Sequence, residues 1–357
     1  MRVCLPKLSW ICLVAGLWLL TVQGCGLLPT DSADLIPPGD GAAGLVVFGD
    51  SLSDTGNFKR VNPGDWALAF HNYDDGRLTS GAASTPPSAE YRQGVWHEVL
   101  MGPALGVPSL QGTANYAFAG ATTRPGTHLY SSGGQPTNAL IRDLGDQVDR
   151  FLEANNGLVS ADNTYVVWAG GNDLMDAVAS EEQGRREHIP AIVINASREA
   201  LQNAEATVRR LAGAGATRIV WGNLPPLYGA PWAARLSDCP NCVLAVFDAV
   251  ATFNRSLEEA AASLESEFQK QNLRIYVLDA EGLFNDIVLD AFLNEGRTYG
   301  ITNFWDAAGD LAPDSDAVDS YLFWDAVHPT SRAHAIIAEA AYDLLVPLAA
   351  GSQIQGR

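Results

Sequence analysis

The sequence predicts an α/β fold in which helices cover a mostly parallel β-sheet. Four strongly apolar runs, each followed by a glycine or a turn, occupy residues 45–48, 164–173, 217–226 and 273–280. Because these runs do not alternate with polar residues, they indicate strands buried on both faces. Segments of helical periodicity lie at residues 139–154, 197–212, 244–271 and 331–348. Strands that alternate with helices in this way predict a parallel, doubly wound sheet.

The remaining segments complete a single predicted domain over residues 44–350. A short strand is expected near residues 114–118. Residues 58–112 lack periodicity and are rich in Gly, Pro, Ser and aromatic residues, so we interpret them as an insertion over the top of the sheet.

The N-terminus has the pattern of an export signal. Arg2 and Lys7 precede an uncharged apolar stretch at residues 8–22, which is short for a membrane-spanning helix. The signal ends in "TVQGC", which resembles a bacterial lipobox with Cys25 as the lipidated mature N-terminus, although Gln23 is unusual there. Ordinary signal cleavage is the alternative. We therefore expect a signal peptide at residues 1–24 and a flexible linker at residues 25–43.

Charge and cysteine content restrict the partners and the compartment. The net charge of −19 disfavours a nucleic-acid partner, because an acidic surface repels phosphate. Cys4 and Cys12 leave with the signal and Cys25 would carry lipid, so Cys239 and Cys242 remain as a pair. In an exported protein this pair favours a disulfide; a redox or a metal site is the alternative.

Ser51 follows the first predicted strand in the stretch "LVVFGDSLSDTGN". Ligands of open parallel sheets bind at the carboxyl ends of the strands, so Ser51 is placed to act as a nucleophile. The α/β-hydrolase pattern G-x-S-x-G is absent, since Ser53 stands at its last position. A helix-capping serine is the simpler reading, whereas Asp50 and Asp54 argue against a phosphate loop.

His328 is the strongest candidate for a general base among six histidines. In "YLFWDAVHPT", Asp325 precedes it by three residues, so the carboxylate can reach Nδ1 and leave Nε2 for a serine. A surface histidine before a helix is the alternative, and His334 on that helix is expected to pack or face solvent.

Two further segments offer hydrogen-bond donors for a negatively charged intermediate. In "AGGND", which ends a strand, the side chain of Asn172 can donate from its amide. In "NYAFAGATT", the backbone N–H of Gly120 is placed to point into the same crevice.

Together, "FGDSLSDTGN", "NYAFAGATT", "GGND" and "DAVHPT" resemble, in order, the motif blocks of the SGNH or GDSL hydrolase family. The resemblance implies a three-layer α/β/α sandwich with a five-stranded, flavodoxin-like parallel sheet. It implies Ser51 as nucleophile, His328 as base and Asp325 as its orienter. It also implies an oxyanion hole from the Ser51 and Gly120 N–H groups and the Asn172 side chain, with no metal or cofactor.

The most similar family members are secreted bacterial esterases, lipases and lysophospholipases, so we expect an exported ester hydrolase acting on a small-molecule or lipid ester. The lipid anchor would hold it in the cell envelope, and Gly26 favours the outer membrane of a Gram-negative host. A carbohydrate O-deacetylase and a non-catalytic binding lipoprotein are the alternatives. Four tryptophans in predicted loops could line an acyl groove, stack on sugars or simply pack: Trp66, Trp96, Trp232 and Trp305.

Overall fold

The computed structural model describes residues 44–69, 73, 76–80, 94–102, 105–107, 110–132, 135–181, 185–311 and 316–346. The chain divides into two units, Met1–Leu35 and Ile36–Arg357, and all of these residues belong to the second unit. The predicted signal peptide, Cys25 and the predicted linker therefore lie outside the described residues. Within the described part of the chain, no helix is long and apolar enough to cross a membrane.

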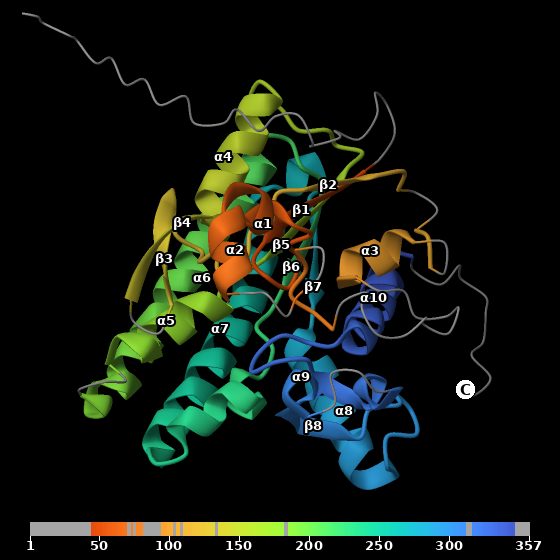
Figure 1. Ribbon diagram of the computed structural model, residues 1–357. Coiled ribbons are helices and arrows are strands. Elements are labelled where there is room, and N and C mark those ends of the chain that lie inside the picture. The colour runs from red at the N-terminus through yellow and green to blue at the C-terminus, as the bar shows by residue number, and fades with distance from the viewer. Residues whose placement is uncertain are drawn as a thin grey trace, which may run out of the picture. The chain divides into compact units, whose positions relative to one another are not determined.

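A five-stranded parallel sheet forms the centre of the domain (Figure 1). Its strands are β1 (Leu45–Gly49), β2 (Thr113–Asn115), β5 (Thr164–Trp168), β6 (Arg218–Gly222) and β7 (Arg274–Leu278). They lie in the order β2-β1-β5-β6-β7, so the direction of winding reverses between β1 and β5. Such a reversal opens a crevice at the carboxyl ends of the two strands, which is where open α/β sheets bind ligands.

Helices cover both faces of the sheet and confirm the predicted three layers. In Figure 1, α4, α6 and α7 lie on one side of the sheet and α3 and α10 on the other. The helices are α1 (Asn57–Val61), α2 (Pro63–Ala69), α3 (Trp96–Met101), α4 (Leu144–Ala154), α5 (Gly171–Glu181), α6 (Ile189–Gly213), α7 (Pro240–Glu267), α8 (Ala280–Asn294), α9 (Ala308–Leu311) and α10 (Ser331–Leu345). Short 3-10 turns are η1 (Arg186–His188), η2 (Leu227–Gly229), η3 (Pro231–Leu236), η4 (Gln269–Gln271) and η5 (Asp316–Ser320).

The predicted strands differ in how deeply they are buried. Every residue of β1 and β5 is buried, as their continuous apolar sequences predict. The edge strand β7 is mostly half-buried and begins at the exposed Arg274. An edge strand has only one hydrogen-bonded neighbour, so its apolar sequence does not require complete burial.

The predicted helix at residues 139–154 was wrong at its start. Residues up to Arg142 belong to strand β4 (Gln135–Arg142), which pairs antiparallel with β3 (Thr127–Ser132). Ala139 and Ile141 are fully buried and Leu140 between them is not, which is the two-residue period of a strand. The helix α4 begins only after the extended Asp143. A second small sheet, β8 (Asn303–Ala307) parallel to β9 (Tyr321–Phe323), was not predicted either.

The long segment interpreted as an insertion contributes α1, α2 and α3. Phe58 and Trp66 from α1 and α2 pack with Phe118 in one buried cluster, and the rings of Phe58 and Phe118 are 5.8 Å apart. On the opposite side, α3 packs against α10, where the backbone N–H of Trp96 donates to Nδ1 of His334 at 3.2 Å.

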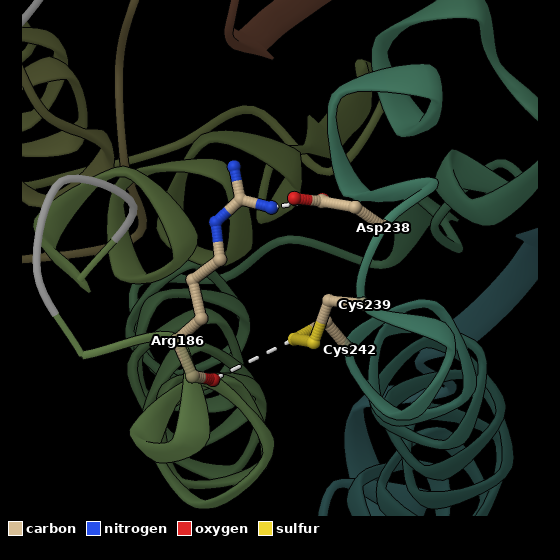
Figure 2. The surroundings of a disulfide bond; sticks show 4 residues. All are labelled: Arg186, Asp238, Cys239 and Cys242. Carbon is tan, nitrogen blue, oxygen red and sulfur yellow. Dashed lines mark hydrogen bonds and ion pairs between the residues drawn. A yellow bond between two sulfur atoms is a disulfide. The ribbon is translucent and has the colours of Figure 1, made fainter.

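A disulfide joins Cys239 and Cys242 at the start of α7 (Figure 2). Sγ of Cys242 lies 3.6 Å from the carbonyl oxygen of Arg186, and the guanidinium of Arg186 pairs with Asp238. Pro240 fits the first helical turn, which needs no N–H donor there. The "CPNC" segment thus connects the N-terminal end of α7 to η1 before α6.

The buried carboxylate of Asp54 connects the turn after β1 to the loop after β2. Oδ1 accepts the N–H groups of Gly56 at 2.7 Å and Asn57 at 2.6 Å. Oδ2 accepts those of Phe58 at 3.0 Å and Ala119 at 2.8 Å. Burial raises the pKa of Asp54, while these four donors favour the ionised form. Without the carboxylate, the buried N–H groups of Phe58 and Ala119 would be left without this partner away from water.

We predict that Asp54→Asn strongly destabilises the protein. The amide has one acceptor oxygen, so about two buried N–H groups lose their partner at a cost of about 1–3 kcal/mol each. Urea denaturation should show a free energy of unfolding at least about 2 kcal/mol lower. Asp248→Asn, on an exposed site of α7, is the matched control and should change little. Equal stability of the two variants would contradict the role given to Asp54.

Candidate active site

The turn that carries Ser51 begins where β1 reaches the edge of the sheet. A Cβ atom on Gly49 would lie 2.3 Å from the carbonyl oxygen of Trp168, so only glycine allows this approach of β1 to β5. The chain then turns: the N–H groups of Ser53 and Asp54 donate to the carbonyl of Asp50 at 3.1 and 3.0 Å. The turn leaves the side chain of Ser51 at the edge of the crevice.

Ser51, His328 and Asp325 form a hydrogen-bonded line. Nε2 of His328 lies 2.9 Å from Oγ of Ser51, and Nδ1 lies 2.6 Å from Oδ2 of Asp325. The other carboxylate oxygen, Oδ1, accepts the N–H groups of Val327 at 2.8 Å and His328 at 2.6 Å. The three-residue spacing of Asp325 and His328 therefore closes a turn whose backbone orients the carboxylate. These three predicted residues lie together in the geometry expected of a nucleophile, its base and the orienting carboxylate.

The segment around His328 is held between β9 and α10. The N–H of Trp324 donates to the carbonyl of His328 at 2.7 Å, and the N–H of Thr330 donates to Leu322 at 3.0 Å. Oγ1 of Thr330 accepts the N–H of Ala333 at 3.2 Å and so caps α10. From the insertion, Oγ1 of Thr79 donates to the carbonyl of Pro329 at 2.8 Å. These contacts fix the backbone on both sides of His328 and so restrict movement of its imidazole away from Ser51 and Asp325.

Electrostatics at the site favour the protonated imidazole. Burial acts to lower the pKa of His328, but the Asp325 carboxylate, its hydrogen bond and the nearby Asp50 outweigh burial and raise the pKa. Burial acts to raise the pKa of Asp325, but the His328 charge and several donors hold it well below its ordinary value. Burial raises the pKa of Asp50, the residue before Ser51, to about 6.

Asn172 and Gly120 lie on adjoining segments. Nδ2 of Asn172 donates one of its two protons to the carbonyl of Ala121 at 2.8 Å. This bond fixes the side-chain amide and does not use the second proton. The next residue, Asp173, accepts from the N–H of Thr123 at 3.0 Å and from its Oγ1 at 2.8 Å. Gly120 has a φ of +80°, a conformation that favours glycine. Two contacts thus attach the Gly120 loop to the start of α5.

A cavity of about 410 Å³, including the part open to solvent, lies beside Ser51. Asp50, Ser51, Asn172 and His328 provide its polar wall, although Gly120 is not among the lining residues. The remainder of the lining is largely apolar: Leu52, Trp168, Ala169, Gly171, Met175, Leu224, Pro225, Leu227 and Val327. In the part of the chain that the structure describes, no group of three or more His, Cys, Asp or Glu side chains could hold a metal ion.

None of the four tryptophans singled out in the sequence is among the residues that line this cavity. Trp66, Trp96 and Trp232 are buried, and Trp305 is 58% exposed elsewhere, on β8. Trp96 and Trp232 form hydrogen bonds to the segments that carry Ser51 and His328. Nε1 of Trp96 donates to Oγ of Ser53 at 3.0 Å, and the N–H of Trp232 donates to the carbonyl of Ala326 at 2.8 Å.

No sequence signal singled out His97 or Tyr73, and His334 was expected only to pack or to face solvent. His97, fully enclosed on α3, lies with Nε2 2.9 Å from the carbonyl of Ser53. His334 is fully buried, so its side chain packs inside the domain and does not face solvent. The hydroxyl of Tyr73 donates to Oδ2 of Asp325, 252 residues away in the chain. No local pattern marks any of these contacts, because each depends on how distant segments meet.

The comparison with known protein families decides the assignment. Residues 45–341 match the model of the GDSL-like lipase/acylhydrolase family. The chain belongs to this family. The match includes the Ser51 turn, the Asn172 segment and the Asp325–His328 turn, and membership assigns the chain to the ester hydrolases.

Curated relatives of this GDSL hydrolase include plant proteins. It is 25% identical to the GDSL esterase/lipase EXL2 of Arabidopsis thaliana, over 87% of this chain and 90% of that protein. It is also 25% identical to acetylajmalan esterase 2 of Rauvolfia serpentina, over 83% of this chain and 88% of that protein. Among solved structures, a catalytic mutant of Axe2, an acetylxylan esterase from Geobacillus stearothermophilus, matches with a TM-score of 0.40 and 16% identity, over 85% and 95% of the two chains.

We predict that ester hydrolysis rises with pH through an apparent pKa above about 6.5, the ordinary imidazole value. The base must be neutral, and Asp325 raises the pKa of His328. Asp325→Asn should therefore move this acidic limb to lower pH and reduce kcat by about 10³-fold or more. The measurement is kcat/KM from pH 4 to 9. Asp162→Asn, at an exposed site, is the control; an unmoved limb in Asp325→Asn would contradict the coupling.

Proposed function

We propose that this GDSL hydrolase is an exported serine esterase that acts through an acyl-enzyme on Ser51. The observation that carries the proposal is the line of hydrogen bonds from Oγ of Ser51 through His328 to Asp325. A serine aligned with a neutral imidazole that is itself held by a carboxylate is an activated nucleophile.

The proposed reaction has two halves. Oγ of Ser51 attacks the ester carbonyl while Nε2 of His328 takes its proton. The negative oxygen of the tetrahedral intermediate is stabilised by the N–H groups of Ser51 and Gly120 and by Nδ2 of Asn172. His328 then gives its proton to the departing alcohol, which leaves the acyl group on Ser51. Water, deprotonated by His328, attacks the acyl carbonyl and releases the acid and the free serine.

The cavity supports an acyl ester of the carboxylesterase, lipase or lysophospholipase type. Its apolar wall, formed in part by Met175, Leu224 and Val327, suits an aliphatic acyl chain. An acetyl group would bury little of this surface. Trp168 is the one tryptophan among the lining residues, and at 1% exposure it offers little surface on which a sugar ring could stack.

A panel of p-nitrophenyl esters with increasing acyl length tests the proposal. Each buried methylene contributes about 0.8 kcal/mol, so butyrate should exceed acetate by up to ~15-fold in kcat/KM. Met175→Trp, which fills the cavity, should lower the ratio of octanoate to acetate hydrolysis.

A fluorophosphonate label and Ser51→Ala are the controls for this panel. Ser51→Ala should abolish labelling and lower kcat by ~10³-fold or more. Labelling that persists in Ser51→Ala would refute the nucleophile. Hydrolysis of acetylated polysaccharide in preference to every acyl ester would favour a deacetylase, and an unlabelled, inactive protein would favour a binding lipoprotein.

Export and lipid anchoring are a further part of the proposal, on residues outside the described ones. The apolar segment of residues 8–22, the "TVQGC" motif and the Cys239–Cys242 disulfide support it, since disulfides persist in oxidising compartments. Nineteen linker residues, 25–43, would reach up to about 65 Å between Cys25 and the domain.

We predict that protein extracted from host membranes has the mass of residues 25–357 plus a diacylglyceryl group on Cys25. Intact mass spectrometry measures this directly. Cys25→Ser should release the protein from the membrane fraction, whereas Cys4→Ser should not, because Cys4 lies within the signal. An unmodified N-terminus beyond Cys25 would show that ordinary cleavage occurs.

A further inference from the structure

Tyr73 reaches the triad from the long segment between β1 and β2. Its hydroxyl donates a hydrogen bond to Oδ2 of Asp325. Its ring stands edge-on to the imidazole of His328, with centroids 6.2 Å apart and an interplanar angle of 84°. On the other side, the ring packs near Trp66, at 6.3 Å. Three separate contacts therefore place Tyr73 against both the base and its carboxylate.

The Asp325 carboxylate accepts four hydrogen bonds, two on each oxygen. Oδ1 accepts two backbone N–H groups, from Val327 and His328. Those bonds fix the carboxylate independently of any side chain. Oδ2 accepts two side-chain donors, Nδ1 of His328 and the hydroxyl of Tyr73. The tyrosine thus shares the one oxygen that acts on the imidazole.

We propose that Tyr73 is a positioning residue of the triad that acts through Asp325. Its hydroxyl occupies part of the acceptor capacity of Oδ2 and so limits how strongly the carboxylate holds the protonated base. This inference rests on the proposed serine mechanism. Tyr73 is not among the residues that line the cavity beside Ser51.

The direction of the effect follows from the shared oxygen. A second donor withdraws negative charge from Oδ2, so the bond from Nδ1 of His328 to that oxygen weakens. The hydroxyl also stabilises the ionised carboxylate, and its hydrogen bond is one of the causes that lower the pKa of Asp325. Without the hydroxyl, Oδ2 interacts more strongly with the imidazolium, and the protonated base becomes harder to discharge onto the leaving alcohol.

The other titratable groups around His328 are the same with or without the hydroxyl. Asp50, on the turn after β1, faces it and favours its charge. His334, from α10, lies beneath it and is kept neutral, because burial together with the charges of His328 and His97 lowers its pKa to about 3. His97, from α3, is likewise kept neutral because burial lowers its pKa. Because the Tyr73 hydroxyl donates to Asp325, we expect the effect of removing it to reach His328 through that carboxylate.

We predict that Tyr73→Phe, which keeps the ring and removes the hydroxyl, raises the pKa of His328 by about half to one pKa unit, the size of one net hydrogen bond. NMR titration of the His328 imidazole, assigned with His328→Ala, measures this without any substrate. The acidic limb of kcat/KM should move to higher pH by the same amount. KM on the alkaline plateau should stay within about twofold, because Tyr73 does not line the cavity.

Tyr165→Phe is the matched control. The hydroxyl of Tyr165, on β5, donates to the backbone carbonyl of Ser160 at 2.9 Å. This substitution should leave the His328 titration unmoved. A His328 pKa in Tyr73→Phe that is unchanged or lower would overturn the inference. Failure of the proposed function has a different signature: the wild-type protein would not react with a fluorophosphonate, whereas the NMR titration would still report on Tyr73.

Discussion

The geometry of the site depends on one buried carboxylate that accepts four backbone N–H groups. Asp54 receives three donors from the start of α1 and one from Ala119, next to Gly120. The turn with Ser51 and the loop after β2 are therefore one hydrogen-bonded unit. Gln147 of α4 extends it, because its side-chain amide accepts from the N–H of Gly49 at 2.9 Å and donates to its carbonyl at 2.8 Å. A position fixed through backbone groups tolerates changes in the surrounding side chains, but not the loss of its acceptor.

Charge is distributed unevenly around the base. Carboxylates face His328 from two sides, Asp325 across Nδ1 and Asp50 from the nucleophile turn. Burial lowers the pKa values of His97 and His334, so both of these imidazoles are kept neutral. One nitrogen of each ring is hydrogen-bonded, His97 Nε2 to the carbonyl of Ser53 and His334 Nδ1 to the N–H of Trp96, and these contacts connect α3 to the Ser51 turn and to α10. The same polar contacts that hold these elements together thus set the electrostatics of the site.

The errors in reading the fold from sequence have specific physical causes. The helix expected from residue 139 began at Leu144, because the period of a few residues at 139–142 fits either structure until the partner strand is known. The pairing of β8 with β9 joins segments separated by α9 and η5, so neither strand has an adjacent partner in the chain. The four tryptophans were expected in loops, yet they lie in α2, α3, η3 and β8, and three of them are buried.

The sequence by itself determined the parallel sheet, and it singled out Ser51, Asn172, Asp325 and His328 as candidate site residues, which the structure brings together at the ends of the strands. It could do so because apolar runs specify buried strands, and because three residues of spacing are enough to bring the Asp325 carboxylate onto Nδ1 of His328. The tertiary structure alone decided the apolar lining of the cavity, the neutral histidines beneath the base and the contact of Tyr73 with Asp325. The last joins residues 252 positions apart. Such contacts depend on the path of the whole chain, and no local pattern of residue types encodes that path.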